Sequence, residues 1–366
     1  MALVPGVVMP HVIRGGSGDM SESTASAERT PGAPPHKPAT IYDVAQAAGV
    51  SHQTVSRFLK GFEGIRPATR ERVERALGEL DYRPNLTARS LKSGRSHRIG
   101  ALTHDLSQVG PSRVAEGASA AAREAGYVLD LISLDARNPR AIEESLDLLT
   151  QHDLAGVLAL SNTDEMTRAF ETSEFRVPAY VHTEADDAVT GHPSDLTGVG
   201  IPALIDHLAD LGHRRLLHIA GPGNWSASRN RILAFEAGVE RAGLASAGIL
   251  AGDWSARSGY EAVRSLPEVP ATAILAANDQ TALGAMLALK ERGLRVPEDV
   301  SVVGIDDIPE AAYYDPPLTT VRIDFESRGR QTLLTLLARI ERTEVRAIDV
   351  PPPELVVRRS SGPASA

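Results

Sequence analysis

The sequence predicts a small, all-α headpiece of the helix-turn-helix type, followed by an α/β core of two subdomains with parallel sheets. The headpiece is indicated by residues 40–57, TIYDVAQAAGVSHQTVSR, which contain two short helical stretches joined by a glycine. The core is indicated by short apolar runs that alternate with longer amphipathic stretches from Ile99 onward, a pattern typical of βα units. A length of 366 residues, 42% of them hydrophobic, is sufficient for both parts.

Residues 1–38 are expected to be a disordered leader, because they contain Gly, Ser, Pro and Ala without a sustained periodicity. Their apolar stretch, residues 2–13, is broken by two prolines and lacks an upstream basic region, so it is not typical of a signal peptide. The chain has no cysteine and no apolar run of membrane-spanning length. These features favour a cytoplasmic protein without a disulfide framework.

The first helix of the headpiece is predicted to begin after Thr40. The hydroxyl of Thr40 can cap the helix, and Asp43 can reach back to complete a capping box. Gly49 can supply the backbone conformation that a tight turn between two helices needs. The apolar face of this helix is predicted to consist of Val44, Ala47 and Ala48.

The second helix has the pattern of a DNA-reading element. Ser51 can cap it, while Val55 together with Phe58 or Leu59 can point inward. The outward side chains of such a helix can then reach base edges and phosphates in the major groove. The predicted DNA contacts of the headpiece are Thr40, Tyr42, Ser51, His52, Gln53, Thr54, Ser56 and Arg57. The alternative is an ordinary helical hairpin in a larger bundle, because short motifs also match by chance.

A third helix is predicted from Pro67 to Leu80, since apolar residues recur there at spacings of three and four. Three helices are sufficient for a minimal core. Pro84 interrupts the helical pattern, and a short polar, basic segment then leads to the strand-like run at Ile99. We therefore expect a headpiece over residues 39–83 and a hinge over residues 84–98.

Residues 39 to about 98 resemble the DNA-binding headpiece and hinge of the LacI/GalR family, the lactose repressor family of bacterial transcriptional regulators. The resemblance implies that the hinge folds into a helix on operator binding, with Asn85, Ala88 and Leu91 among its DNA contacts. It also implies that Leu91 wedges into the minor groove, where an apolar side chain can separate a flexible base step. The alternative for Leu91 is a linker residue that packs on the core.

The charge of the chain is divided unevenly along its length. The total of −9 is unusual for a DNA-binding protein, but binding depends on the local field. Residues 39–98 hold 11 Lys or Arg against 6 Asp or Glu, a net charge of +5. Residues 99–366 hold 24 against 38, a net charge of −14. Only the headpiece and hinge are therefore expected to attract phosphate.

The core is predicted to span residues 99–366. Its short apolar runs predict strands at residues 99–103, 127–132, 156–160, 179–181, 216–220, 273–276 and 300–305. Its longer amphipathic stretches predict helices that include residues 113–125, 141–151, 201–211, 229–242 and 280–292. In such sheets, small ligands bind beyond the carboxyl ends of the strands.

Polar and aromatic side chains follow several of these strands, where a ligand site is expected. Carboxylate, amide and guanidinium groups can hydrogen-bond neighbouring sugar hydroxyls, while an aromatic face covers the apolar side of the ring. Only 4% of the residues are aromatic, so a Trp in such a loop is a candidate contact. The residues after the strands are His104 and Asp105, Trp225 and Arg229, Asn278 and Asp279, and Asp306 and Asp307.

The core also resembles the periplasmic-binding-protein-like, sugar-binding domain of the same family. The resemblance implies that Arg229, Asn278, Asp306 and Phe325 hold the effector. His104, Trp225 and Thr183 depart from the family, which has serine, serine and aspartate at those positions. We expect His104 and Trp225 to contact the ligand as well, and the three departures to alter which sugar is bound.

Structural alternatives remain open for three of these residues. Asp279 and Asp307 could serve as helix caps, and Arg229 could belong to a buried ion pair.

Catalysis and metal binding are not expected. Asp306 and Asp307 are adjacent, but neighbouring carboxylates on a chain usually diverge, and no GxSxG, HExxH or phosphate-loop motif is present. The spacing of His182, His192 and Asp195 matches no common zinc pattern. An exported sugar receptor would fit residues 99–366, but it conflicts with the headpiece and with the lack of a signal peptide.

The sequence thus predicts a cytoplasmic repressor, without a cofactor, whose affinity for double-stranded operator DNA is controlled by a small molecule, a mono- or disaccharide. The alternatives are an activator or dual regulator that responds to a sugar, and a regulator that responds to a non-sugar metabolite. The family resemblance implies a homodimer. Residues 345–366 lack the leucine heptads of a tetramerisation helix, so dimers alone are expected.

Overall fold

The computed structural model describes residues 39–59, 61–82, 96–135, 137–161, 163–181, 184 and 187–365. The chain divides into two compact units, Met1–Pro84 and Asn85–Ala366. The predicted hinge contacts Asn85, Ala88 and Leu91 lie outside the described residues, as does Thr183.

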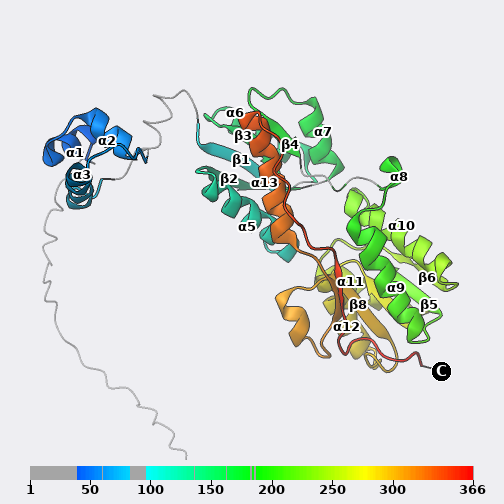
Figure 1. The fold of residues 1–366 in the computed structure, drawn as a ribbon. Helices are drawn as coiled ribbons and strands as arrows, with labels where there is room; N and C mark the ends of the chain where they lie inside the picture. Colours follow the sequence, from blue (N-terminus) through cyan, green and yellow to red (C-terminus); the bar gives the residue numbers. More distant parts are fainter. Residues whose placement is uncertain are drawn as a thin grey trace, which may run out of the picture. The chain divides into compact units, whose positions relative to one another are not determined.

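The described residues of the first unit form three helices, α1 (Ile41–Ala48), α2 (His52–Leu59) and α3 (Pro67–Glu79) (Figure 1). Thr40 and Asp43 form the predicted capping box, in which the Asp43 amide donates to Thr40 Oγ1 over 3.3 Å. α1 ends at Gly49, whose φ of 61° lies in the left-handed region. The Thr54 amide donates to Ser51 Oγ over 3.2 Å, so Ser51 caps α2 as predicted.

The apolar face of α1 differs from the prediction in one residue. Val44 and Ala48 are buried, but Ala47 is exposed and Ala45 is buried in its place. α1 packs against both α2 and α3, and the face that meets them includes residue 45 instead of residue 47. The sequence could not distinguish residues 45 and 47, because both are alanines and both lie next to the apolar face formed by Val44 and Ala48. The core of the unit is completed by Val55, Val73 and Ala76.

The first subdomain of the second unit contains a parallel, four-stranded sheet with the order β2-β1-β3-β4. Its strands are β1 (Arg98–Thr103), β2 (Val128–Ser133), β3 (Gly156–Ala159) and β4 (Ala179–Val181). Helices α5 (Val109–Glu124), α6 (Pro139–Thr150) and α7 (Asp164–Thr172) connect them. The central strands β1 and β3 are buried almost throughout, which explains their continuous apolar sequences.

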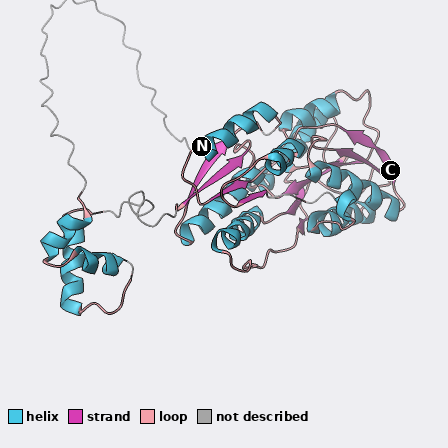
Figure 2. Ribbon diagram, turned by 90° about the horizontal axis from the view of Figure 1, so that it is seen from above, coloured by secondary structure: helices cyan, strands magenta, loops and turns pink. Residues whose placement is uncertain are grey.

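The second subdomain contains a six-stranded sheet with the order β10-β9-β8-β7-β5-β6, in which only β10 is antiparallel. The strands are β5 (Arg215–Ile219), β6 (Ala245–Leu250), β7 (Ala273–Ala276), β8 (Ser301–Asp306), β9 (Thr319–Arg322) and β10 (Glu354–Val356). The longer helices are α9 (Ile201–Asp210), α10 (Ser226–Arg241), α11 (Ala256–Arg264) and α12 (Asp279–Glu291). The short elements are α8 (Asp187–Thr190), the π-helical turn η1 (Leu196–Gly200) and the 3₁₀ turn η2 (Pro309–Tyr313). Helices lie on both sides of the strands of the second unit (Figure 2).

Helix α13 (Phe325–Glu341) follows the second sheet in the sequence, yet it packs against α5 in the first subdomain (Figure 1). Two glycines permit this close contact. A Cβ atom added to Gly117 would lie 1.9 Å from the Glu326 carbonyl oxygen, and one added to Gly329 would lie 2.0 Å from that of Val114. The chain then returns to the second subdomain, where β10 pairs with β9.

All the strands that the sequence predicts are present, and their ends differ from the prediction by no more than one residue. Three further strands, β6, β9 and β10, were not predicted. β6 contains Gly248 at a φ of 121° and has no regular alternation, while β9 and β10 contain 4 and 3 residues. Their backbone groups are satisfied by neighbours that are distant in sequence, so tertiary pairing determines where they form.

The contact between α5 and α13 can be tested at Gly117. We expect Gly117→Ala to lower the free energy of unfolding of the core by roughly 1–3 kcal/mol, because the added methyl group must push the two helices apart. Urea unfolding followed by circular dichroism measures this. Gly78→Ala in α3 is the control, since its Cβ would meet no atom within 4 Å and alanine favours a helix by about 0.5–1 kcal/mol. Unchanged stability of Gly117→Ala would contradict the described packing.

Candidate functional site

The second unit contains a cavity between its two subdomains, with a volume of about 120 Å³, and the cavity is partly open to solvent. The first subdomain, α13 and the segment after β4 contribute His104, Gln108, Gly110, Pro111, Val114, Leu160, Glu184, Phe325 and Arg328. The second subdomain contributes Trp225, Ala227, Arg231, Trp254, Asn278, Gln280 and Asp306. Several of these residues follow the carboxyl ends of strands, which is where the sequence predicted a ligand site.

Trp225, Trp254 and His104 form an aromatic cluster in this cavity. The ring centroids of His104 and Trp225 are 4.5 Å apart and those of the two tryptophans are 6.3 Å apart, both with edge-to-face geometry. Each tryptophan is 8% exposed, and neither indole N–H has a hydrogen-bond partner among the described residues. Because buried donors are normally paired, these two N–H groups are available to acceptor atoms of a ligand.

Arg231 provides a buried cation at the same place. Its guanidinium lies over the Trp254 ring, 4.9 Å from the centroid, and its Nη1 donates to the Ala277 carbonyl. Its Nε is buried without a hydrogen-bond partner among the described residues. Arg231 therefore supports the indole of Trp254 and retains a donor for a ligand.

Asp306 is the last residue of β8 and has an unusual backbone conformation. Its φ of 118° is rare for any residue other than glycine, and strain of this kind is concentrated at functional sites. Its Oδ1 is buried without a hydrogen-bond partner in the described part of the chain. Burial raises the pKa of Asp306 to about 7, although Arg231 and Arg328 oppose the shift. Near neutral pH this carboxyl group can therefore either donate or accept a hydrogen bond.

Asn278 and His104 line the cavity, and hydrogen bonds within the protein involve both polar atoms of Asn278 and Nδ1 of His104. Asn278 caps α12 by accepting from the Thr281 amide over 2.9 Å, and its amide nitrogen donates to the Trp254 carbonyl over 3.0 Å. His104 Nδ1 lies 2.7 Å from Ser161 Oγ, and burial lowers the pKa of His104 to about 4. His104 is thus neutral at pH 7, and Asn278 serves mainly to position Trp254.

Phe325 lines the cavity from the first residue of α13. Its ring lies beside Gly110 in α5, where an added Cβ atom would be 3.4 Å from Phe325 Cζ. The predicted aromatic residue is therefore held at the cavity by the contact between α5 and α13.

Arg229, which was predicted to hold the effector, does not line the cavity in this structure. Its Nη1 and Nη2 each lie 3.0 Å from a carboxylate oxygen of Asp164, in a partly exposed ion pair rather than a buried one. Two residues correspond to about 200° of rotation around a helix, so Arg229 and Arg231 project from opposite sides of α10. Arg231 is therefore the arginine at the cavity.

Several cavity residues were missed by the sequence analysis. Arg231 could have been found from the helical register of α10, which places it opposite Arg229. Trp254 follows β6, a strand that was not predicted. Its backbone has a φ of 71°, and a non-glycine residue in this conformation cannot be recognised from the sequence. The other missed polar residues are Gln108, Glu184, Gln280 and Arg328.

Asp279 is not a helix cap, because Asn278 occupies that position. The carboxylate of Asp279 instead accepts from the Ile308 amide over 2.9 Å and from Thr320 Oγ1 over 2.5 Å. Burial and the nearby Asp306 raise its pKa well above the ordinary value. Asp279 therefore fastens the loop after β8 to β9.

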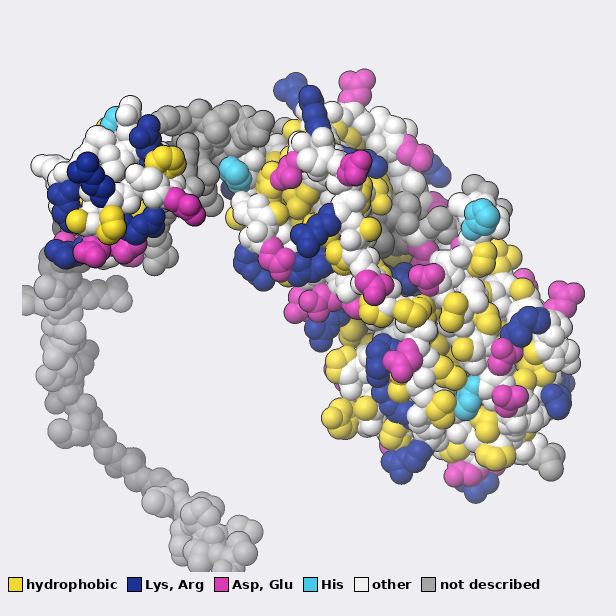
Figure 3. All heavy atoms as spheres, in the orientation of Figure 1, with side chains coloured by type: hydrophobic (Ala, Val, Ile, Leu, Met, Phe, Trp, Pro, Cys, Tyr) yellow, Lys and Arg dark blue, Asp and Glu magenta, His cyan; other side chains and the backbone are white. Residues whose placement is uncertain are grey.

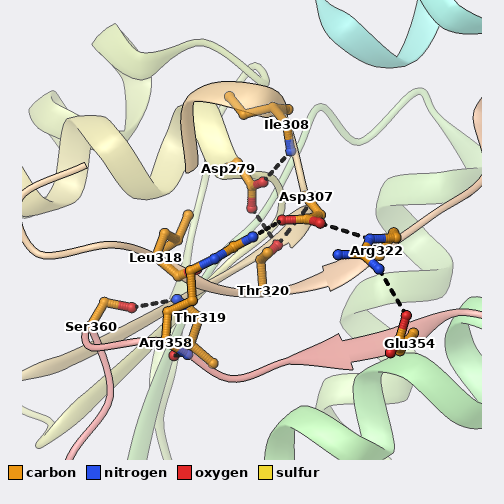
Figure 4. A network of polar contacts seen from close by, with 10 residues as sticks. All are labelled: Asp279, Asp307, Ile308, Leu318, Thr319, Thr320, Arg322, Glu354, Arg358 and Ser360. Carbon is orange, nitrogen blue, oxygen red and sulfur yellow. Dashed lines mark hydrogen bonds and ion pairs between the residues drawn. The ribbon is translucent and has the colours of Figure 1, made fainter. Parts of the chain in front are cut away.

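Asp307 does not cap a helix either. It accepts from Arg322 Nε over 2.8 Å and from Arg358 Nη2 over 2.6 Å (Figure 4). Arg358 also donates to the Leu318 carbonyl, so this network attaches the segment after β10 to the loop that follows Asp306.

The predicted DNA contacts of the headpiece lie at the start of α1 and along α2. Ser51, Gln53 and Arg57 are exposed, whereas His52, Thr54 and Ser56 are half-buried. Tyr42 is 66% exposed, with its ring 5.2 Å from that of His52. Lys and Arg side chains gather on the visible face of this unit, together with some acidic groups (Figure 3). Thr40 is used as the cap of α1.

Within the described residues, no helix is long and apolar enough to cross a membrane. The same part of the chain contains no group of three or more His, Asp or Glu side chains that could hold a metal ion. Of the residues considered for zinc, His182 lies outside the described residues.

Both units match known protein families. Residues 40–85 match the bacterial regulatory proteins of the lacI family, and residues 205–361 match the periplasmic binding protein-like domain. The chain is 34% identical over 333 residues to the lactose operon repressor of Escherichia coli (strain K12), covering 89% of this chain and 91% of that protein. This chain belongs to the LacI family.

Other members of the LacI family are similar over most of the chain. The HTH-type transcriptional repressor PurR of Haemophilus influenzae (strain PittEE) is 32% identical, covering 88% of this chain and 98% of that protein. The ribose operon repressor of E. coli (strain K12) is also 32% identical, with 82% and 93% coverage.

Solved structures of the family have the same fold. The lac repressor dimer bound to operator and the anti-inducer ONPF aligns with a TM-score of 0.73 at 32% identity, over 89% of this chain and 100% of that one. The complex of the transcriptional regulator CelR with cellobiose aligns with a TM-score of 0.63 at 31% identity, over 88% and 100%. The predicted fold class is confirmed. This LacI-family protein is a transcriptional regulator with a DNA-binding headpiece and an effector domain, and it is not an enzyme.

The burial of Asp306 predicts a pH-dependent stability. Its pKa rises from about 3.8 in the unfolded chain to about 7 in the folded protein, so the folded state binds more protons between these values and loses stability as pH rises. Asp306→Asn removes the effect. We expect this variant to exceed the parent in unfolding free energy by an amount that grows from about pH 4 and levels off above about pH 7, at no more than about 4 kcal/mol over the whole interval. Thermal and urea unfolding from pH 5 to 8 measure this difference. A difference independent of pH would contradict the raised pKa. Because the charge of Asp306 also raises the pKa of Asp279, the measured difference includes the release of Asp279 from that interaction.

Proposed function

We propose that this LacI-family regulator is a cytoplasmic repressor that binds a pseudopalindromic operator as a homodimer and is controlled by a mono- or disaccharide. The observation that carries the effector assignment is the cavity itself. It combines two indole N–H donors, Arg231 Nε and Asp306 Oδ1, all buried and without hydrogen-bond partners among the described residues. Such donors and acceptors beside aromatic faces suit the hydroxyl groups and apolar face of a sugar.

The names of several relatives support a sugar as the effector. The lactose and ribose operon repressors are named for sugars, and the similar CelR structure contains cellobiose. The contacts proposed here are His104, Trp225, Asn278, Asp306 and Phe325, with Arg231 and Trp254 added by the structure. Arg229 is not among them, because it is paired with Asp164.

The proposed control follows from the position of the cavity between the subdomains. An effector that contacts both subdomains changes how closely they approach, and this alters the attachment points of the two headpieces in a dimer. Two recognition helices must lie about one DNA turn apart to read both half-sites. The effector therefore shifts the population toward or away from the operator-binding form, within the limit of its differential affinity. The operator-bound dimer of the similar lac repressor supports this arrangement.

Base reading by α2 is tested at Gln53, which is exposed on that helix. We expect Gln53→Ala to reduce discrimination between operator variants by roughly 1–3 kcal/mol, because a base contact is lost. The operator is first selected from a random DNA library with the parent protein, and affinities are then measured by fluorescence anisotropy at fixed salt. An equal loss on operator and on random DNA would show that Gln53 only contacts the backbone.

The effector class is tested by a thermal-shift screen of mono- and disaccharides and their phosphates, because a ligand of the native state raises Tm. We expect at least one neutral sugar to raise the Tm of the parent. Asp306→Ala should bind operator with parental affinity but show neither the Tm shift nor a change in operator binding when that sugar is added. If no compound in the panel raises the Tm of the parent, a non-sugar effector is favoured. If Asp306→Ala responds to the sugar as the parent does, Asp306 does not contribute to effector binding.

A further inference from the structure

A row of contacts joins the two subdomains beside the cavity. Thr163, which precedes α7, forms an isolated antiparallel bridge with Trp225, which precedes α10. The Asp164 amide donates to the Asn224 carbonyl over 3.1 Å, and Asn224 Nδ2 donates to Glu165 Oε2 over 3.0 Å. The start of α7 is therefore attached to the loop before α10.

The strongest member of this row is the ion pair between Arg229 and Asp164. Two guanidinium nitrogens face two carboxylate oxygens at 3.0 Å, which is the bidentate geometry that arginine favours. Arg229 Nη1 also donates to the Gly223 carbonyl over 2.9 Å. The side chain of Arg229 thus holds its own preceding loop as well as the opposite subdomain.

Trp225 lies at the point where these contacts meet the cavity. Its backbone belongs to the bridge with Thr163, while its indole lines the cavity and contacts the His104 ring edge-to-face at 4.5 Å. Thr163 is itself fixed, because its hydroxyl accepts from the Met166 amide and caps α7. Any separation of Asp164 from Arg229 would therefore move Trp225 relative to His104.

We propose that Asp164 and Arg229 form a latch that holds the two subdomains together over the cavity and positions Trp225 in it. Both are positioning residues, since neither lines the cavity. The consequence for effector control rests on the proposed function, whereas the latch itself does not.

The latch is able to open because the ion pair is accessible to solvent, with side-chain exposures of 33% for Arg229 and 44% for Asp164. Exposed pairs are screened by salt and favour the paired state by a modest factor, about 1.4- to 5-fold. The ion pair therefore biases an equilibrium between joined and separated subdomains without making it irreversible.

The two tryptophans allow the latch to be measured without an effector. The chain contains 2 tryptophans, and both line this cavity, so tryptophan fluorescence reports on the cleft alone. Acrylamide quenching is measured on the full chain for the parent, Asp164→Arg, Arg229→Asp and the charge-exchanged double variant. We expect each single variant to raise the quenching constant, by up to about fivefold, and the double variant to return it toward the parental value.

Salt and a matched ion pair provide the controls. Raising the salt concentration should increase quenching of the parent more than that of the single variants, since they lack the ion pair between Arg229 and Asp164. Asp206→Arg breaks a comparable exposed pair, Asp206 with Arg241 at 2.7 Å, which lies wholly within the second subdomain. This control should leave quenching at the parental level.

The proposal is overturned if both single variants keep parental quenching, or if the double variant is quenched as strongly as the singles. A single variant with a lowered Tm does not obscure the result, because recovery of both Tm and quenching in the double variant requires the two charges to interact. If no sugar in the screen raises the Tm of the parent but the double variant recovers the parental quenching constant, the proposed effector class is refuted and the proposed latch is supported.

Discussion

The close packing of α13 against α5 is the constraint on which the structure of the second unit depends. It requires glycine on both helices, because the backbone carbonyls of Glu326 and Val114 occupy the space of any side chain at residues 117 and 329. The contact places the last helix of the chain in the first subdomain, although its preceding strand and the following β10 belong to the second. Phe325 and Arg328 consequently face the cavity together with Gly110 and Pro111 of α5.

The other wall of the cavity depends on the loop after β8. Asp306 adopts a strained conformation there, and its burial disfavours its charged form. Asp279 accepts hydrogen bonds from Ile308 in this loop and from Thr320 in β9. Asp307, which belongs to the loop, forms ion pairs with two arginines. The adjacent acidic pair thus divides its roles: Asp307 holds the structure by ion pairs, while Asp306 leaves one carboxylate oxygen unused. Backbone strain at a ligand site is tolerable when the surrounding contacts fix it in this way.

The two arginines of α10 show a similar division between structure and recognition. Arg231 projects to the cavity and stacks on Trp254, while Arg229 projects to the other side and joins the opposite subdomain. One helix therefore carries a cation that lines the cavity and a cation that joins the two subdomains, two residues apart. A rotation or shift of α10 would alter both contacts together, which provides a direct physical connection between the cavity and the approach of the subdomains.

The sequence by itself determined the local elements of this protein. Capping residues, glycine turns and apolar periodicity depend on neighbours along the chain, so Thr40, Gly49 and Ser51 and the buried strands could be predicted directly. The motif of the headpiece and the order of the core elements were likewise sufficient to indicate the family. Tertiary structure decided what depends on distant partners: the strands β6, β9 and β10, the burial of Ala45 instead of Ala47, and the association of α13 with α5. It also decided that Arg231 instead of Arg229 faces the cavity. The sequence gives the angle between two side chains on a helix, but which of them faces the cavity depends on how the helix packs against its neighbours.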